Sequence, residues 1–86
     1  MIENYKEGFA DCYSGLCYYK KYGDISVFDK IAEARELRYK EMKKSNGDNY
    51  VHPNFNIEAP KILKQTIEDL KNQGIDIRNL PFLDKN

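Results

Sequence analysis

The sequence has no tryptophan, only one histidine, and no surplus of either charge, because its 14 basic and 14 acidic side chains cancel. A single histidine argues against a histidine-based metal site within one chain. A net charge of zero gives no bulk electrostatic attraction to nucleic acid or to an anionic membrane. Either of those partners would therefore need a local basic patch.

Long apolar runs are also missing. No stretch approaches the roughly 20 residues of a membrane span, and the N-terminus lacks the basic-then-apolar build of a secretory signal. Cys12 and Cys17 are five residues apart on an expected helix, where their Cα atoms would lie roughly 8 to 9 Å apart, too far for an unstrained disulfide. Free cysteines near an apolar face indicate a reducing compartment. We expect a cytoplasmic protein with no membrane partner.

Motifs that carry catalysis are absent as well. The glycines form neither a G-x-x-x-x-G-K-[ST] nor a G-x-G-x-x-G phosphate-binding loop. Two cysteines separated by four residues, without further cysteine or nearby histidine, make a poor zinc site. A nucleophile pair can be drawn between either cysteine and His52, but nothing in the spacing supports it. We predict no cofactor, no metal and no enzymatic activity.

The 86 residues are 41% hydrophobic and 33% charged, a composition typical of one folded soluble domain. Such a chain buries a modest core and has a net stability on the order of 5 kcal/mol, so help from a partner or from self-association fits. We predict an all-α domain with helices near residues 2–22, 26–44 and 60–73, a loop over 45–59 and an extended C-terminal segment over 74–86. The first two helices should form an antiparallel hairpin, with the third crossing it.

The first helix carries the clearest pattern. Apolar residues recur at intervals of three and four, and this seam is expected to face the core; its members are Ile2, Tyr5, Phe9, Cys12, Leu16 and Tyr19. Gly8 and Gly15 flank the seam. Because glycine costs roughly 1 kcal/mol against alanine inside a helix, the pair indicates a close approach to the backbone. The neighbour in this notch is either another helix of the same fold or a ligand or second protein.

Local signals place the ends of the helices. Gly23 suits the end of the first helix, and Ser26 with Asp29 three residues later suits a capping box at the start of the second. Pro60 is expected in the first turn of the third helix, where its missing N–H costs nothing. After that helix we expect an extended or single-turn segment that lays Ile77, Leu80 and Phe82 across the bundle.

Five residues are predicted to contact a protein partner. Tyrosine is favoured at protein interfaces. Two tyrosines and an aspartate lie on a flank of the first helix away from the seam, and two more candidates come from the aromatic loop. The five residues are Asp11, Tyr18, Tyr22, Tyr50 and His52. Arg35 lies in the middle of the apolar face of the second helix. Its head either reaches a carboxylate on the first helix or solvent, or meets an anionic ligand.

Three functions remain open. The first is a non-catalytic protein-binding module, similar in size and composition to phage and mobile-element products that block host enzymes or defence systems. The second is a nucleotide or nucleic-acid binder, in which Tyr18, Tyr19 and Tyr22 stack on bases while cations meet phosphates; those cations are Lys20, Lys21 and Arg35. The third is a self-associating structural protein, a homodimer formed through the glycine-notched helix.

Overall fold

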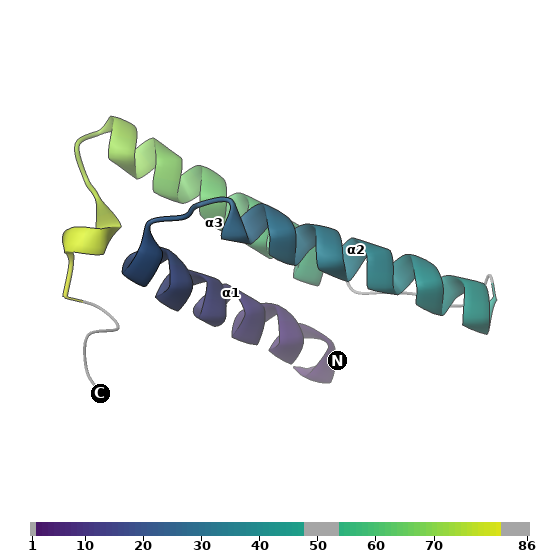
Figure 1. Ribbon diagram of the computed structural model, residues 1–86. Helices are drawn as coiled ribbons and strands as arrows, with labels where there is room; N and C mark the ends of the chain where they lie inside the picture. The colour runs from purple at the N-terminus through teal and green to yellow at the C-terminus, as the bar shows by residue number, and fades with distance from the viewer. Residues whose placement is uncertain (1, 48–53, 82–86) are drawn as a thin grey trace.

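The computed structural model describes residues 2–47 and 54–81, which form three α-helices and a short 3-10 helix (Figure 1). α1 spans Ile2–Tyr22, α2 spans Val27–Asn46, α3 spans Phe55–Asn72 and η1 spans Ile77–Asn79. No strand occurs within these ranges. The prediction of a small all-α domain with three helices is confirmed.

α2 runs antiparallel to the other two helices. Near its start, Asp29 accepts a hydrogen bond of 2.6 Å from Lys64, far along α3. Near its end, Tyr39 accepts a hydrogen bond of 2.8 Å from Asn56, at the start of α3. α1 and α2 form the expected antiparallel hairpin (Figure 1), and α3 packs against both of its helices. The expected crossing of the hairpin by α3 stays a prediction.

α1 and α3 run side by side in the same direction. Gly8, early in α1, lies against Phe55 and Asn56 at the start of α3. Tyr19, late in α1, shares a buried cluster with Ile67, late in α3. The two helices are thus parallel and level with each other, and both pack on α2.

The core is small and consists of two clusters. The first cluster takes one side chain from each helix, namely Tyr19, Phe28 and Ile67. The second takes three side chains from α2 and α3, namely Ala32, Tyr39 and Ile57. The molecule measures 46 × 28 × 20 Å and has a radius of gyration of 14.8 Å. A compact domain of this length would have a radius of gyration of about 12 Å. The helices therefore form a thin, elongated layer that leaves much apolar surface outside.

The two helix glycines of α1 face this core. A Cβ atom at Gly15 would lie 2.7 Å from Cε1 of Phe28, and one at Gly8 would lie 2.9 Å from Cδ2 of Phe55. Both distances are too short for a real side chain. The neighbour that fills the glycine notch is therefore the rest of the same fold, which was the first of the two alternatives.

The α1–α2 link follows the sequence in part. Gly23 has a positive φ of 74°, and its N–H donates to the Tyr19 carbonyl at 2.7 Å, so the predicted end of α1 is confirmed. The predicted capping box is wrong, because the Ser26 hydroxyl makes no cap and donates instead to Asp24 Oδ1 at 2.5 Å. That hydroxyl and the Ser26 N–H lower the pKa of the Asp24 carboxyl. α2 also continues to Asn46, two residues beyond the expected end.

The third helix begins at Phe55 and not near residue 60, so the placement of Pro60 in its first turn is wrong. Pro60 lies inside α3 and is buried, and the turn before it places Asn56 and Ile57 in the core. The burial of that turn offsets the backbone hydrogen bond that proline cannot make. The expected loop over 45–59 is thus helical at 45–46 and 55–59, while 48–53 lie outside the described residues.

The C-terminal segment adopts the single-turn alternative. Ile77 packs against the first core cluster from η1, as expected. Leu80 remains 45% exposed, so its predicted place across the bundle is wrong. Phe82 lies outside the part of the chain that the structure describes.

Candidate functional site

The apolar seam of α1 points into the core only in part, since Tyr19 is buried there and Leu16 packs against it, while Phe9 is exposed. Phe9 is 64% exposed, and Tyr13 beside it is 59% exposed, so the predicted burial of Phe9 is wrong. Cys12 and Leu16 are half-buried, and only Tyr19 is fully buried. The side chains of Ile2 and Tyr5 lie outside the described part. The glycines explain the difference, because they let α2 and α3 approach the α1 backbone and so turn the seam toward the edge.

A groove of about 360 Å³ runs between this edge of α1 and the neighbouring edge of α3. Its walls are almost wholly apolar, and its lining residues are Phe9, Cys12, Phe55, Glu58, Ala59, Ile62, Leu63 and Thr66. The rings of Phe9 and Phe55 meet across it with their centroids 5.0 Å apart. Ile62 stands at its outer side and is 62% exposed. We call this surface the α1–α3 groove.

The α1–α3 groove, together with Tyr13 beside it, exposes apolar side chains at the surface. At about 200 Å² for each large side chain, the exposed parts of Phe9, Tyr13 and Ile62 alone amount to roughly 350 Å². That is within the range of the largest apolar patch found on typical monomers, and such patches are often functional. Sequence reasoning missed the groove because a seam that faces a partner has the same spacing as a seam that faces the core.

A second exposed feature lies on the other flank of α1. Tyr18 and Tyr22 are 43% and 58% exposed, and their ring centroids are 4.7 Å apart. The prediction that this flank stays outside the core is confirmed. Lys21 places its ammonium 5.3 Å from the centre of the Tyr22 ring. The predicted role of both tyrosines in binding a partner stays a prediction.

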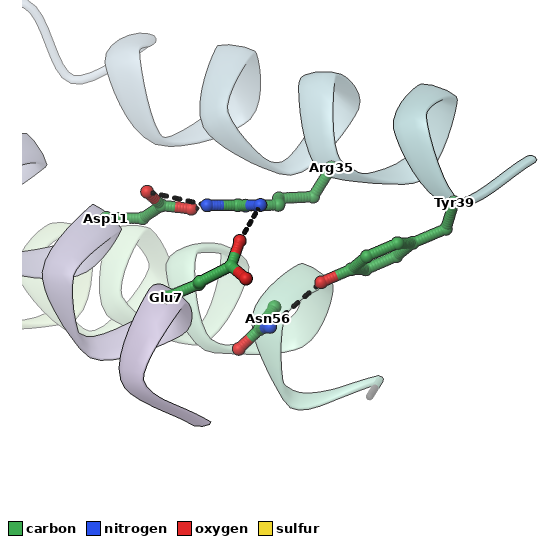
Figure 2. A network of polar contacts seen from close by, with 5 residues as sticks. All are labelled: Glu7, Asp11, Arg35, Tyr39 and Asn56. Atoms are coloured by element: carbon green, nitrogen blue, oxygen red, sulfur yellow. Dashed lines mark hydrogen bonds and ion pairs between the residues drawn. The ribbon is translucent and has the colours of Figure 1, made fainter. Parts of the chain in front are cut away.

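Arg35 ties α2 to α1 (Figure 2). Its Nε donates to Asp11 Oδ2 at 2.6 Å, and its Nη1 forms an ion pair with Glu7. The hydrogen bond that Arg35 donates to Asp11 and the two negative charges raise the pKa of Arg35, so the guanidinium stays charged. The prediction that Arg35 reaches a carboxylate on the first helix is confirmed. The same figure shows the buried Asn56, which donates to Tyr39.

Several of the other candidate residues are engaged in contacts within the fold. Asp11 serves a helix–helix bridge, and a contact role for it stays a prediction. The Lys20 ammonium donates to the carbonyls of Arg78 and Leu80 at 2.9 and 2.7 Å, so it fastens the C-terminal segment to α1. Tyr19 is 1% exposed, so its suggested stacking on a base is wrong. Tyr50 and His52 lie outside the described residues.

Within residues 2–47 and 54–81, no group of three or more His, Cys, Asp or Glu side chains is arranged to hold a metal ion. In the same ranges, none of the helices combines the length and the apolar character that crossing a membrane requires. No family model, no curated protein and no solved structure matches this chain. The case for a function therefore depends on the surface itself.

Proposed function

We propose that this protein is a non-catalytic protein-binding module whose main contact surface is the α1–α3 groove. The observation that carries the proposal is the outward position of Phe9 and Tyr13 on α1 and of Ile62 on α3, each about 60% exposed. Aromatic residues are enriched where proteins meet, and an apolar patch bordered by charged residues marks such a site. The same proposal includes a reducing cytoplasmic location, which the free cysteines support. It also includes a role as an inhibitor of a host enzyme or defence system, which the small size supports.

The groove has the dimensions of a helix-binding site. The residues that line it on α3 recur at intervals of four, three and four, from Phe55 through Ala59 and Ile62 to Thr66. At 1.5 Å per residue this strip is about 16 Å long, which matches about three turns of a partner helix. An amphipathic helix with apolar residues at positions i, i+3 or i+4, and i+7 would fill it.

The Tyr18–Tyr22 pair supplies a second contact surface in this proposal. Both rings are exposed and already lie against each other, so little side-chain freedom would be lost on binding. The pair lies on a different flank of α1 from the α1–α3 groove. A partner that used both surfaces would have to wrap around α1.

The nucleotide or nucleic-acid alternative has less support. Of the three cations suggested for phosphate, Arg35 is paired with two carboxylates and Lys20 with two carbonyls. Lys21 and the two exposed tyrosines are what remains of that cluster. Weakening of oligonucleotide binding by added salt would be the evidence in its favour.

A capture experiment with two matched variants tests the protein-binding proposal. Tagged protein is used to isolate partners, and each identified partner is then purified and titrated. Ile62→Glu places a charge in the α1–α3 groove and is expected to weaken binding at least about 30-fold. Leu37→Glu is the control, because Leu37 is exposed on α2 to a similar extent, 59%. Equal binding by both variants would show that the groove is not the contact surface.

A further inference from the structure

We infer that the α1–α3 groove is covered by the same groove of a second copy of this chain. The two copies form a twofold dimer in which α1 of each subunit lies against α3 of the other. The inference depends on the proposed function, since it names the protein that the groove binds. Three observations carry it: the geometry of the two strips, the charges along their borders and the area that they expose.

The first observation is that the groove presents apolar side chains on two parallel helices. α1 supplies Phe9 and Cys12, with Tyr13 and Leu16 beside them, and α3 supplies the strip from Phe55 to Thr66. Because Gly8 lies beside Asn56 and Tyr19 shares a buried cluster with Ile67, the shorter strip of α1 lies within the length of the α3 strip. Such a pair of helices forms one flat apolar layer. Two identical layers placed face to face complete a four-helix arrangement with a buried centre.

The second observation is that the borders of the two strips carry opposite charges. Along the outer border of α1, helical spacing places the exposed side chains of Lys6, Ala10, Cys17 and Lys21. Along the outer border of α3 it places those of Glu58, Gln65 and Asp69. Among the border residues whose side chains the structure describes, the charged ones are lysines on α1 and carboxylates on α3.

Those charges select one of the two possible twofold arrangements. An axis parallel to the helices brings α1 of one copy opposite α3 of the other, so that Lys21 comes level with Asp69. An axis across the helices would place α1 on α1 and α3 on α3, with like charges together. Complementary charges favour the first arrangement and oppose the second.

The third observation is the exposed area. The roughly 350 Å² on Phe9, Tyr13 and Ile62 is nearly half of the about 800 Å² that each partner buries in a standard interface. The half-buried side chains of the groove and the charged borders add to it. The single chain has only a small core. Burying the apolar face of α1 and α3 in a dimer would add apolar contacts that the single chain lacks.

The first test is the mass of the purified protein in solution, measured by sedimentation equilibrium over a range of concentrations. We expect twice the chain mass of 10.1 kDa. Ile62→Glu should raise the dimer dissociation constant at least about 30-fold, while Leu37→Glu leaves it unchanged. Far-ultraviolet circular dichroism of both variants checks that the helices remain folded. A dimer that survives Ile62→Glu intact would overturn the inference.

The second test is a charge exchange between the two borders. Lys21→Glu should weaken the dimer, and adding Asp69→Lys in the same chain should restore it, because the exchanged pair again has opposite signs. If the double variant is weaker than the single one, the two positions do not face each other, and the α1-against-α3 arrangement is overturned.

The third test traps the dimer. Cys17 is exposed and lies level with Gln65, so in the dimer the two positions face each other across the border. Mild oxidation of Gln65→Cys should give a covalent dimer, with Cys17 of one copy linked to the introduced cysteine of the other, as peptide mapping will show. Links that join Cys17 only to Cys17 would contradict the arrangement.

These tests separate the inference from the proposed function. A chain that stays monomeric at every concentration, while Ile62→Glu still abolishes binding of another purified protein, would overturn the second copy and leave the proposed function standing. A monomer in which Ile62→Glu changes no binding at all would overturn both.

Discussion

The inner side of α1, which packs against α2 and α3, carries glycines, whereas the outer side carries large aromatic residues. Side-chain size alone would suggest the opposite arrangement, with the aromatic residues inside. The inner side presents Gly8 and Gly15, and the neighbouring helices press their side chains against the bare backbone there. The outer side presents Phe9 and Tyr13, both largely exposed. In this molecule, close approach to a glycine notch decides which way the helix faces. Phe9 and Tyr13 are left at the surface, while Tyr19, farther along the same helix, is buried.

The largest expected effect comes from comparing two phenylalanines on opposite sides of this division. Phe28 is completely buried, and Phe28→Ala should lower the free energy of unfolding by about 3–5 kcal/mol. Phe9→Ala should lower it by less than about 1 kcal/mol, because most of the ring is already in water. Both changes are made in the Ile62→Glu background, where dimer formation does not contribute, and are measured by urea unfolding. Equal losses would show that Phe9 belongs to the core.

Gly15→Ala tests the inner side directly. The added Cβ would lie 2.7 Å from Phe28 and 3.1 Å from Ile31, so the helices must separate. Overpacking costs about 1–3 kcal/mol, and the better helix propensity of alanine returns at most about 1 kcal/mol. We expect a net loss of stability in thermal unfolding. Ser14→Ala, at the exposed neighbouring position, is the control and should stay within about 0.5 kcal/mol. A gain of stability in Gly15→Ala would mean that the notch is not filled.

Arg35→Met tests the polar bridge between α1 and α2. The change leaves Glu7 and Asp11 facing each other without their cation, and the side chain of Arg35 is only 18% exposed. We expect the free energy of unfolding to fall by about 1–2 kcal/mol, since part of the interaction is screened by water. Arg38→Met, on an exposed part of the same helix, should have little effect. Identical urea midpoints for the two variants would show that the bridge contributes nothing.

The smallest expected effect concerns the two thiols. Burial, together with the adjacent Asp11, raises the pKa of Cys12, whereas Cys17 is exposed. A raised pKa leaves less thiolate at a given pH, so iodoacetamide should modify Cys12 more slowly than Cys17 near pH 8, and the Cys12 rate should continue to rise at higher pH. Mass spectrometry of the two peptides gives both rates. Faster modification of Cys12 would place it outside the groove wall.

Several features could be predicted from the sequence because local signals specify them. The helical class follows from apolar spacing, the end of α1 from the positive φ that Gly23 adopts, and the exposure of Tyr18 and Tyr22 from their distance from the seam. The Arg35 bridge followed from a cation on an apolar face that needed a carboxylate within reach. Each of these depends on a few neighbouring residues or on one simple pairing.

Other features depend on contacts between distant segments and could not be read locally. The rotation of α1 is set by Phe28, Ile31 and Phe55 entering the glycine notches. The early start of α3 depends on burial of Asn56 and Ile57, which outweighs the usual placement of proline in a first turn. The α1–α3 groove escaped prediction for the same reason, since its two halves are more than 40 residues apart in the sequence.

The most direct test is hydroxyl-radical oxidation of Phe9 and Phe28 in the Ile62→Glu variant, read out by mass spectrometry of the two peptides. If the seam of α1 lies at the surface, Phe9 will be oxidised many times faster than Phe28, and in the unmodified protein Phe9 will become protected as the protein concentration rises. Equal protection of both rings in the variant would place Phe9 in the core and contradict this account.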